Sequence, residues 1–461
     1  MRSRGSAAAL VARSLLLAGT ASAPAWADGP AVDRSGPDYE MSIHGETHAE
    51  LFRRALLPGT DGALIATETV APVRQYIRAR ARDLGADDGA LDFELAGWTG
   101  AWLGEEGHAD GDIQSANAGY RRGIWALRFG RQQVTGGAAR FSRFDGLDAA
   151  AELGAGFRAE AYAGFTVLPR WNERPGYHYL GAATLSELRS HEVLGREDRA
   201  NHLLAGARFG WSSDDASAGV SFHEQHGSQG LVRRNLGARA RGHVLDDATL
   251  GADGILELDS VRLADARLFF DWALLSELDV SAEYLHTEPS LLLPRDSVLS
   301  VFSTDAYDEA GGSARARPAR FLALEAAGFA QFRPSGHAGT RSEVAARIAL
   351  DQTERAFARI AYTRVLAPDN GYHSLRTSLR KSLLDTLAGT LEAYQYYYDR
   401  SIRGRRVSSV FAGTLSYEPR SSFSAVFGAS LAQSPYARFD AQTQLAVAYD
   451  FDFVTRRGGA R

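Results

Sequence analysis

The chain has 461 residues, no cysteine and a formal net charge of -5 at pH 7. The lack of cysteine excludes disulfides, thiolate metal sites and cysteine nucleophiles, and the mildly acidic balance gives no bulk attraction to nucleic acid. The basic charge is almost all arginine, because Lys381 is the single lysine.

The N-terminus has the pattern of a secretory signal peptide over residues 1–27. It combines a positive start at Arg2 and Arg4, a leucine-rich apolar stretch, and a small-x-small cleavage site ending at Ala27. We therefore expect an exported chain with a short leader over 28–40. Export argues against the hypothesis of a cytoplasmic enzyme.

After the leader, period-two alternation recurs from about residue 70 to the end of the chain. The first clear segment, 70–83, places Arg74, Arg78, Arg80 and Arg82 on one face and small or apolar residues on the other. This period indicates a β-strand with one wet and one apolar face. Segments of about 10 to 13 residues have the length needed to cross a bilayer at the tilt of a barrel strand.

Residues 124–152 carry a local motif. Gly130-Arg131-Gln132 lies on a predicted strand, a glycine-containing loop follows, and Phe144-Asp145-Gly146 opens the next strand. Over these residues the chain resembles alginate-export-type barrels, which are outer-membrane channels that pass anionic polysaccharide through an arginine-lined lumen. The resemblance implies that Arg128, Arg131 and Asp145 lie near the pore wall.

The same alternation continues in the segments 156–167, 341–350, 372–383 and 445–453. In the last of these, Tyr449, Phe451 and Phe453 share the face opposite Asp450 and Asp452. A terminal strand that closes on tyrosine and phenylalanine is typical of outer-membrane barrels, although here a tail over 454–461 follows it.

Two long connections separate the strands, at 168–199 and 288–317. In outer-membrane barrels such loops are usually external or fold inward and narrow the pore. The alternative for the second connection is that it contains a short strand at 297–303.

Arginines recur on the polar face of the predicted strands, including 231–243 and 354–363. Arginine on a lipid face costs a few kcal/mol at the bilayer midplane, so the alternation should direct these side chains into the lumen. The predicted pore-lining residues are Arg74, Arg78, Arg80, Arg82, Arg128, Arg233, Arg239, Arg241, Arg341, Arg347, Arg355, Arg359, Arg376 and Arg380.

Two interpretations of these arginines stay open. Rings of arginine favour anions in a pore. The arginines can equally pair with acidic residues across the wall and form a neutral, stiffening lattice. The candidate acidic partners are Asp92, Glu94, Glu160, Glu283, Glu343, Asp450 and Asp452.

The remaining motifs do not indicate chemistry. We find no Gly-x-Ser-x-Gly, HExxH or Walker pattern. His44 and His48, with Glu46 and Glu50 nearby, fall in the leader or first strand, so we predict neither a metal site nor a cofactor.

Four tyrosines stand close together near a predicted strand end, at positions 394, 396, 397 and 398. We interpret them as interfacial aromatic anchors. A sugar-stacking track would require aromatic residues aligned down the lumen.

Hydrocarbon offers no hydrogen-bond partner, so every strand edge must be paired. We therefore predict an all-β, closed antiparallel transmembrane barrel over 41–453. The candidate segments number about 20, whereas the 434 residues after the signal peptide, at roughly 24 per strand, give 18. We predict 18 strands, within a range of 16 to 22, around an aqueous lumen.

The sequence thus predicts a non-enzymatic outer-membrane channel that passes anionic solutes or exports polysaccharide. Its partners would be outer-membrane lipid, the solute and, for export, periplasmic proteins, with no nucleic acid. The alternative is a non-transporting barrel that acts as a receptor, adhesin or assembly scaffold through its external loops. A membrane-embedded hydrolase is a third hypothesis, and it requires a serine, a histidine and an acid at one rim.

Overall fold

The computed structural model describes residues 39–56, 66–84, 89–103, 108–167, 202–228, 230–292, 306–334, 336, 339–352, 355–368, 370–402, 404–435 and 439–455. The predicted signal peptide, most of the leader, the connection at 168–199, the segment 297–303 and the end of the tail lie outside these residues.

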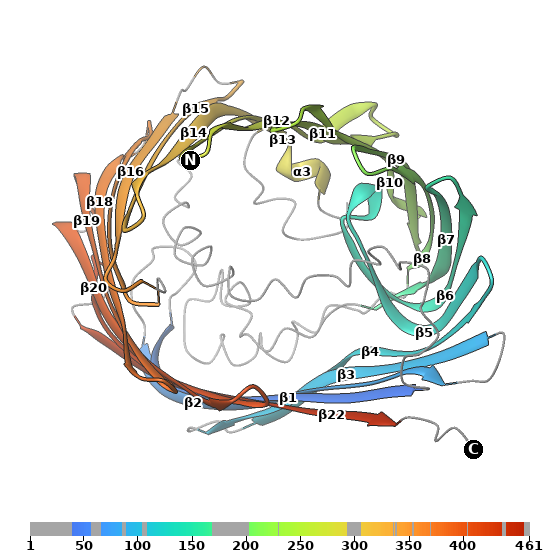
Figure 1. The fold of residues 1–461 in the computed structure, drawn as a ribbon, viewed down its shortest axis with the longest axis horizontal. Coiled ribbons are helices and arrows are strands. Elements are labelled where there is room, and N and C mark those ends of the chain that lie inside the picture. The colour runs from blue at the N-terminus through green and yellow to red at the C-terminus, as the bar shows by residue number, and fades with distance from the viewer. Residues whose placement is uncertain are drawn as a thin grey trace.

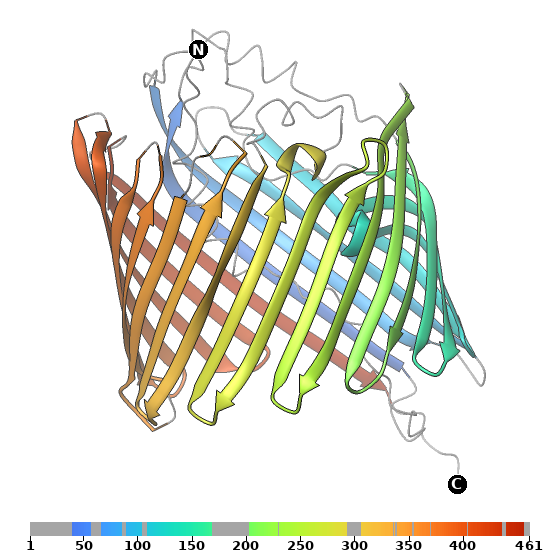
Figure 2. The ribbon, with the colours of Figure 1, turned by 90° about the horizontal axis from the view of Figure 1, so that it is seen from above.

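The described strands form one closed barrel (Figures 1 and 2). They are β1 (Tyr39–Leu56), β2 (Ala66–Leu84), β3 (Gly89–Leu103), β4 (His108–Arg122), β5 (Trp125–Thr135), β6 (Phe141–Gly154), β7 (Phe157–Thr166), β8 (Leu203–Ser212), β9 (Ala216–Gly227), β10 (Gly230–Leu245), β11 (Ala248–Glu257), β12 (Arg262–Leu275), β13 (Leu278–Thr287), β14 (Tyr307–Ala319), β15 (Leu322–Phe332), β16 (Gly339–Ala349), β17 (Phe357–Leu366), β18 (Tyr372–Leu384), β19 (Leu387–Ile402), β20 (Arg405–Arg420), β21 (Phe423–Gln433) and β22 (Asp440–Thr455). Each pairs antiparallel with the next, and β1 pairs with β22, which closes the ladder.

The all-β closed antiparallel architecture is confirmed, but the prediction of 18 strands is wrong, because the sheet has 22. The error came from the assumed number of residues per strand. Nine connections between consecutive described strands, such as the turn between β6 and β7, contain only two residues. Short turns leave more of the chain for strands, so the same length builds a wider barrel.

The two ends of the barrel differ. Seven of the two-residue turns lie at one end, which we call the tight-turn end. The opposite end, called the loop end, carries most of the longer connections and the short helix α3 (Pro289–Leu292) (Figure 2). At the loop end the expected connection 288–317 is corrected, because its last part, from Tyr307 on, belongs to β14. Among the described residues, no helix is long and apolar enough to cross a membrane.

The wall is one sheet thick, so an apolar core exists only locally. It consists of Val134, Ala139, Phe144, Tyr162 and Leu204. These residues meet where the connection between β5 and β6, with its 3-10 turn η2 (Gly137–Ala139), folds against the inside of the wall.

Candidate solute pathway

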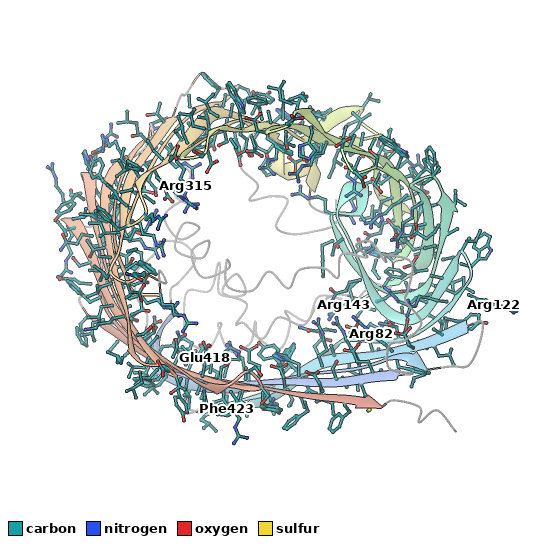
Figure 3. All side chains as sticks on the ribbon, viewed as in Figure 1. Arg82, Arg122, Arg143, Arg315, Glu418 and Phe423 are labelled. Carbon is teal, nitrogen blue, oxygen red and sulfur yellow. The ribbon has the colours of Figure 1, made fainter. Side chains whose placement is uncertain are left out.

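The side chains of each strand alternate between a lumen face and an outer face. Figure 3 shows Arg82, Arg315 and Glu418 pointing into the ring, and Arg122 and Phe423 pointing away from it. Residues that pair directly across a β-ladder project to the same side of the sheet. Once one residue is known to face the lumen, the register therefore shows which residue of each neighbouring strand faces the lumen too.

The outer face is mostly apolar, with charged residues such as Arg122 and Arg364 near the strand ends. Val73 and Ile77 of β2, Leu391 of β19 and Phe427 of β21 are each at least 37% exposed there. On β2 the opposite face carries Arg74, Arg78, Arg80 and Arg82, as the alternation predicts. Apolar side chains outside and charged ones inside are the arrangement of a barrel immersed in lipid.

Many predicted arginines are paired with carboxylates on the lumen face. Arg74 lies 3.1 Å from Glu50, and Arg78 and Arg80 lie 3.6 and 3.3 Å from Glu94. On β14 to β19, the predicted arginines form the ion pairs Arg341–Glu309 (3.3 Å), Arg359–Glu325 (3.1 Å), Arg359–Glu343 (3.3 Å) and Arg376–Glu392 (3.0 Å). These arginines form a largely neutral lattice, the second of the two interpretations.

A second group of arginines lies near the tight-turn end. Arg82, Arg239, Arg241 and Arg380 are exposed, lie near the ends of β2, β10 and β18, and make no ion pair with a described carboxylate. The Arg241 guanidinium lies 5.9 Å from the centre of the Phe269 ring, and Arg347 of β16 lies 4.5 Å from that of Phe357. These four arginines therefore place positive charge on the lumen face near this end that no described carboxylate neutralises by an ion pair.

Three of the predicted arginines belong to neither of these two groups. Arg355 precedes β17, in the connection from β16, so the predicted strand over 354–363 begins too early. Arg233 is on the lumen face of β10 but is only 8% exposed, because the β5–β6 connection covers it. Arg128 lies on the lumen face of β5, where Asp148 is its direct cross-strand partner.

The tip of the β5–β6 hairpin docks on the lumen face of β8 to β12, as Figure 1 shows inside the ring beside β9 and β10. The Ala138 N–H donates to Ser221 Oγ (2.9 Å), and Asn235 Nδ2 donates to the Ala138 carbonyl (3.3 Å). A Cβ added to Gly237 would lie 2.7 Å from the Ala138 nitrogen. A side chain at position 237 would therefore collide with the docked tip.

Charged side chains hold both sides of this tip. Arg208 of β8 donates to the carbonyls of Thr135 (2.6 Å) and Gly136 (2.8 Å). Arg140, at the end of η2, forms an ion pair of 3.3 Å with Asp265 of β12. The hairpin thus reaches from β6 to β12 along the inner wall and takes up part of the cross-section.

Beneath the hairpin lies a buried polar cluster around His223, which is 0% exposed. Arg233 donates to His223 Nε2 (2.9 Å) and to Ser142 Oγ (3.1 Å). Because a guanidinium can only donate, Nε2 must accept, which leaves His223 Nδ1–H to donate to the Tyr162 hydroxyl at 3.0 Å. Satisfied hydrogen bonds of this kind offset the cost of burying polar groups.

The inward fold interrupts the ladder between β4 and β5. The register joins them over Ala116–Arg122, whereas β4 continues to pair with β3 as far as His108. Beyond the interruption, Arg131 and Arg143 each donate to the Ile113 carbonyl (3.2 and 3.5 Å). Arginine side chains thus replace part of the missing backbone ladder.

Two ion pairs lie at this interruption. Arg143 and Asp112 are 2.6 Å apart, and their side chains are only 2% and 8% exposed. Arg131 and Asp145 form two parallel hydrogen bonds of 2.8 and 2.9 Å. The resemblance placed Arg131 and Asp145 near the pore wall, and the structure places them on the back of the hairpin, paired with each other.

The histidine motif near the N-terminus belongs to β1. His44 pairs with Asp450 (2.7 Å), His48 with Glu46 (2.7 Å), and Glu50 with Arg74. Within the described residues, no group of three or more histidine and acidic side chains is arranged to hold a metal ion.

The interpretation of the four tyrosines as interfacial anchors is corrected for three of them. Arg315, which points into the lumen, begins a series of direct partners that continues through Glu325, Ala345, Ala361, Arg376 and Tyr394. Tyr394, Tyr396 and Tyr398 therefore face the lumen, whereas Tyr397 faces outward and is 45% exposed. The alternation of β19 predicts this lumen-facing position, because the three tyrosines follow Glu392 at every second residue and therefore lie on the same face of the strand.

The sequence contains less evidence that the β5–β6 hairpin folds into the lumen. Gly136 and Gly137, both at positive φ, and Gly237 mark the contact. Residues 136 and 237 are far apart in the chain, and nothing in the local pattern connects them.

No protein-family model matches the chain, and no curated protein matches it. Solved structures with a similar fold include the P pilus usher PapC translocation pore (10% identity, TM-score 0.44, 89% of this chain and 99% of that chain). Others are Acinetobacter baumannii OccAB4 (8%, 0.40, 92% and 100%) and Pseudomonas aeruginosa OccK5 (10%, 0.37, 90% and 98%). These similarities are too distant to carry a functional argument, and they give no support to the alginate-export resemblance.

Proposed function

We propose that this chain is a non-enzymatic channel of a Gram-negative-type outer membrane, through whose lumen hydrophilic solutes cross. The observation that carries the proposal is the closed ladder of 22 strands with an apolar outer face and a charged lumen face. Closure gives every strand a neighbour on both sides, so that the backbone is paired in lipid, and at the interruption between β4 and β5 arginine side chains bond to the Ile113 carbonyl. A barrel of this width is not filled by its own wall side chains.

The proposed preference is for anionic solutes. Near the tight-turn end, Arg82, Arg239 and Arg380 face the lumen without an ion pair to a described carboxylate. Exposed arginines favour anions in a pore. Asp271 and Asp279 face the same end from β12 and β13, where they oppose this effect and keep the selectivity moderate.

Polysaccharide is a second candidate solute, because the lumen face of β19 also carries a row of tyrosines. Export as the direction of transport, the periplasmic partners and the signal peptide remain predictions from the sequence.

The test is the reversal potential of the purified full-length protein in a planar bilayer under a KCl gradient. We expect ohmic conductance with a moderate anion preference. Arg380→Gln should shift the reversal potential toward cations. Lys381→Gln, its neighbour on the outer face, removes the same charge and should leave the potential unchanged. Folded protein that does not conduct, or a wild-type channel that prefers cations, would contradict the proposal.

A further inference from the structure

The lumen face of β18 and β19 carries a row of tyrosines that begins near the loop end. Tyr372 of β18 is the direct partner of Tyr398, and Tyr396 and Tyr394 follow on β19 toward the middle of the wall. Successive lumen-facing residues of a strand are about 6.8 Å apart. Four aromatic rings thus follow the direction of the tilted strands over roughly two such steps, with Tyr372 beside Tyr398.

The rings pack against each other edge to face, and each remains partly open to the lumen. The centre of the Tyr372 ring lies 5.7 Å from that of Tyr396 and 6.5 Å from that of Tyr398, with interplanar angles of 62° and 66°. All four tyrosines are half-buried. Cross-strand packing fixes their orientation, so a solute meets preformed apolar surfaces.

Polar groups border the rings, and they are balanced in charge. Arg376 lies 4.8 Å from the centre of the Tyr394 ring and donates to Glu392 (3.0 Å), which also accepts from the Tyr394 hydroxyl (2.8 Å). Within the described residues, the hydroxyls of Tyr372 and Tyr396 make no hydrogen bond. The row therefore offers π faces, donors and acceptors without a net charge.

We propose that Tyr372, Tyr394, Tyr396 and Tyr398 form a binding track for uncharged, ring-bearing polyhydroxylated solutes, that is, for oligosaccharides. The apolar C–H faces of the sugar rings pack on the tyrosines. The sugar hydroxyls exchange hydrogen bonds with the Arg376–Glu392 pair and with the phenols of Tyr372 and Tyr396. Several weak, adjacent sites let a chain advance from one ring to the next without being trapped.

The facing wall differs from the track. There the docked hairpin covers Tyr162 of β7, which is only 4% exposed (Figure 1). A solute entering at the loop end therefore meets the tyrosines of β18 and β19, which the hairpin does not cover. The proposal rests on the proposed function, because it takes the lumen as the path of the solute.

The test is block of the bilayer current by maltohexaose, an uncharged linear sugar. The wild-type channel should show reversible, concentration-dependent block, and sorbitol, which has hydroxyls but no ring, should cause none. The double variant Tyr396→Ala/Tyr398→Ala should raise the half-blocking concentration by roughly tenfold, since each aromatic contact contributes a factor of about two to ten. Tyr397→Ala, on the outer face of the same strand, should behave like wild type.

A second measurement keeps the track testable if the barrel does not conduct. Calorimetric titration of the detergent-solubilised protein with maltohexaose should show binding that the double variant weakens. If the alanine variants fail to fold, Tyr396→Leu, which keeps the apolar volume but lacks the ring, replaces them. Absence of both block and binding in wild type, or an equal effect of Tyr397→Ala, would overturn the proposal. Absence of conductance with binding intact would overturn the channel alone.

Discussion

Two parts of the inner wall carry the same kinds of side chains, but these are buried in one part and partly exposed in the other. Under the β5–β6 hairpin, Tyr162, His223 and Arg233 are 4%, 0% and 8% exposed. On β18 and β19, across the ring, the lumen-facing tyrosines are half-buried and the Arg376 side chain is 43% exposed. A lumen-facing position is therefore not in itself a pore-lining position.

The two parts also satisfy their arginines differently. Arg376 is paired with a carboxylate and stacked on a ring, in contact with the lumen. Arg233 is held by neutral acceptors inside a packed cluster. Burial makes each of those hydrogen bonds costly to lose, whereas solvent replaces them at the open wall. The residues under the hairpin thus form a rigid packed cluster, whereas the residues on β18 and β19 can exchange hydrogen-bond partners with a solute.

The largest effect is expected at the buried ion pair beside the hairpin. Arg143→Ala leaves Asp112 buried without this partner and should lower the free energy of unfolding by about 3–5 kcal/mol. Arg376→Ala, which breaks an open-wall pair, should lower it by about 0–1 kcal/mol. Urea unfolding of barrels folded into lipid vesicles measures both. Equal losses would remove the distinction between the two parts of the wall.

A smaller effect sharpens the assignment of faces on the open wall. Leu391→Arg places a charge on the outer face of β19 and should lower the free energy of unfolding in vesicles by about 2–4 kcal/mol if the residue lies near the bilayer midplane. Thr390→Arg, one residue earlier and on the lumen face, lies directly opposite Arg380 and should cost less than about 1 kcal/mol. The same urea titration applies, and a reversed order would mean that the faces are misassigned.

The smallest expected change in stability concerns the docking of the hairpin. Gly237→Val forces a side chain against Ala138 and should cost about 1–3 kcal/mol. Because the tip can leave the wall to relieve the collision, we also expect altered single-channel conductance and faster proteolysis of the tip. Gly242→Val on the same strand, where an added Cβ has only ordinary contacts at 3.6 Å or more, is the control. A Gly237→Val channel identical to wild type would show that the tip does not depend on this contact.

Much of the fold could be predicted from the alternation of residues. The faces of β2, β16, β18 and β22 follow directly from it, since a strand in lipid cannot place arginine outward without a large cost. The strand number could not be predicted in the same way. It depends on how many residues the turns use, and a two-residue turn such as the one between β12 and β13 leaves little trace in composition.

The sequence by itself determined which side of each strand is apolar, because that depends only on neighbours two residues apart. Only the tertiary structure decided which lumen-facing residues remain open. Arg233 and Arg376 both face the lumen and have the same chemistry, and they differ because a hairpin from β5 and β6 folds onto one and not the other. That contact joins residues about 100 positions apart through shape and hydrogen bonds, which no local periodicity records.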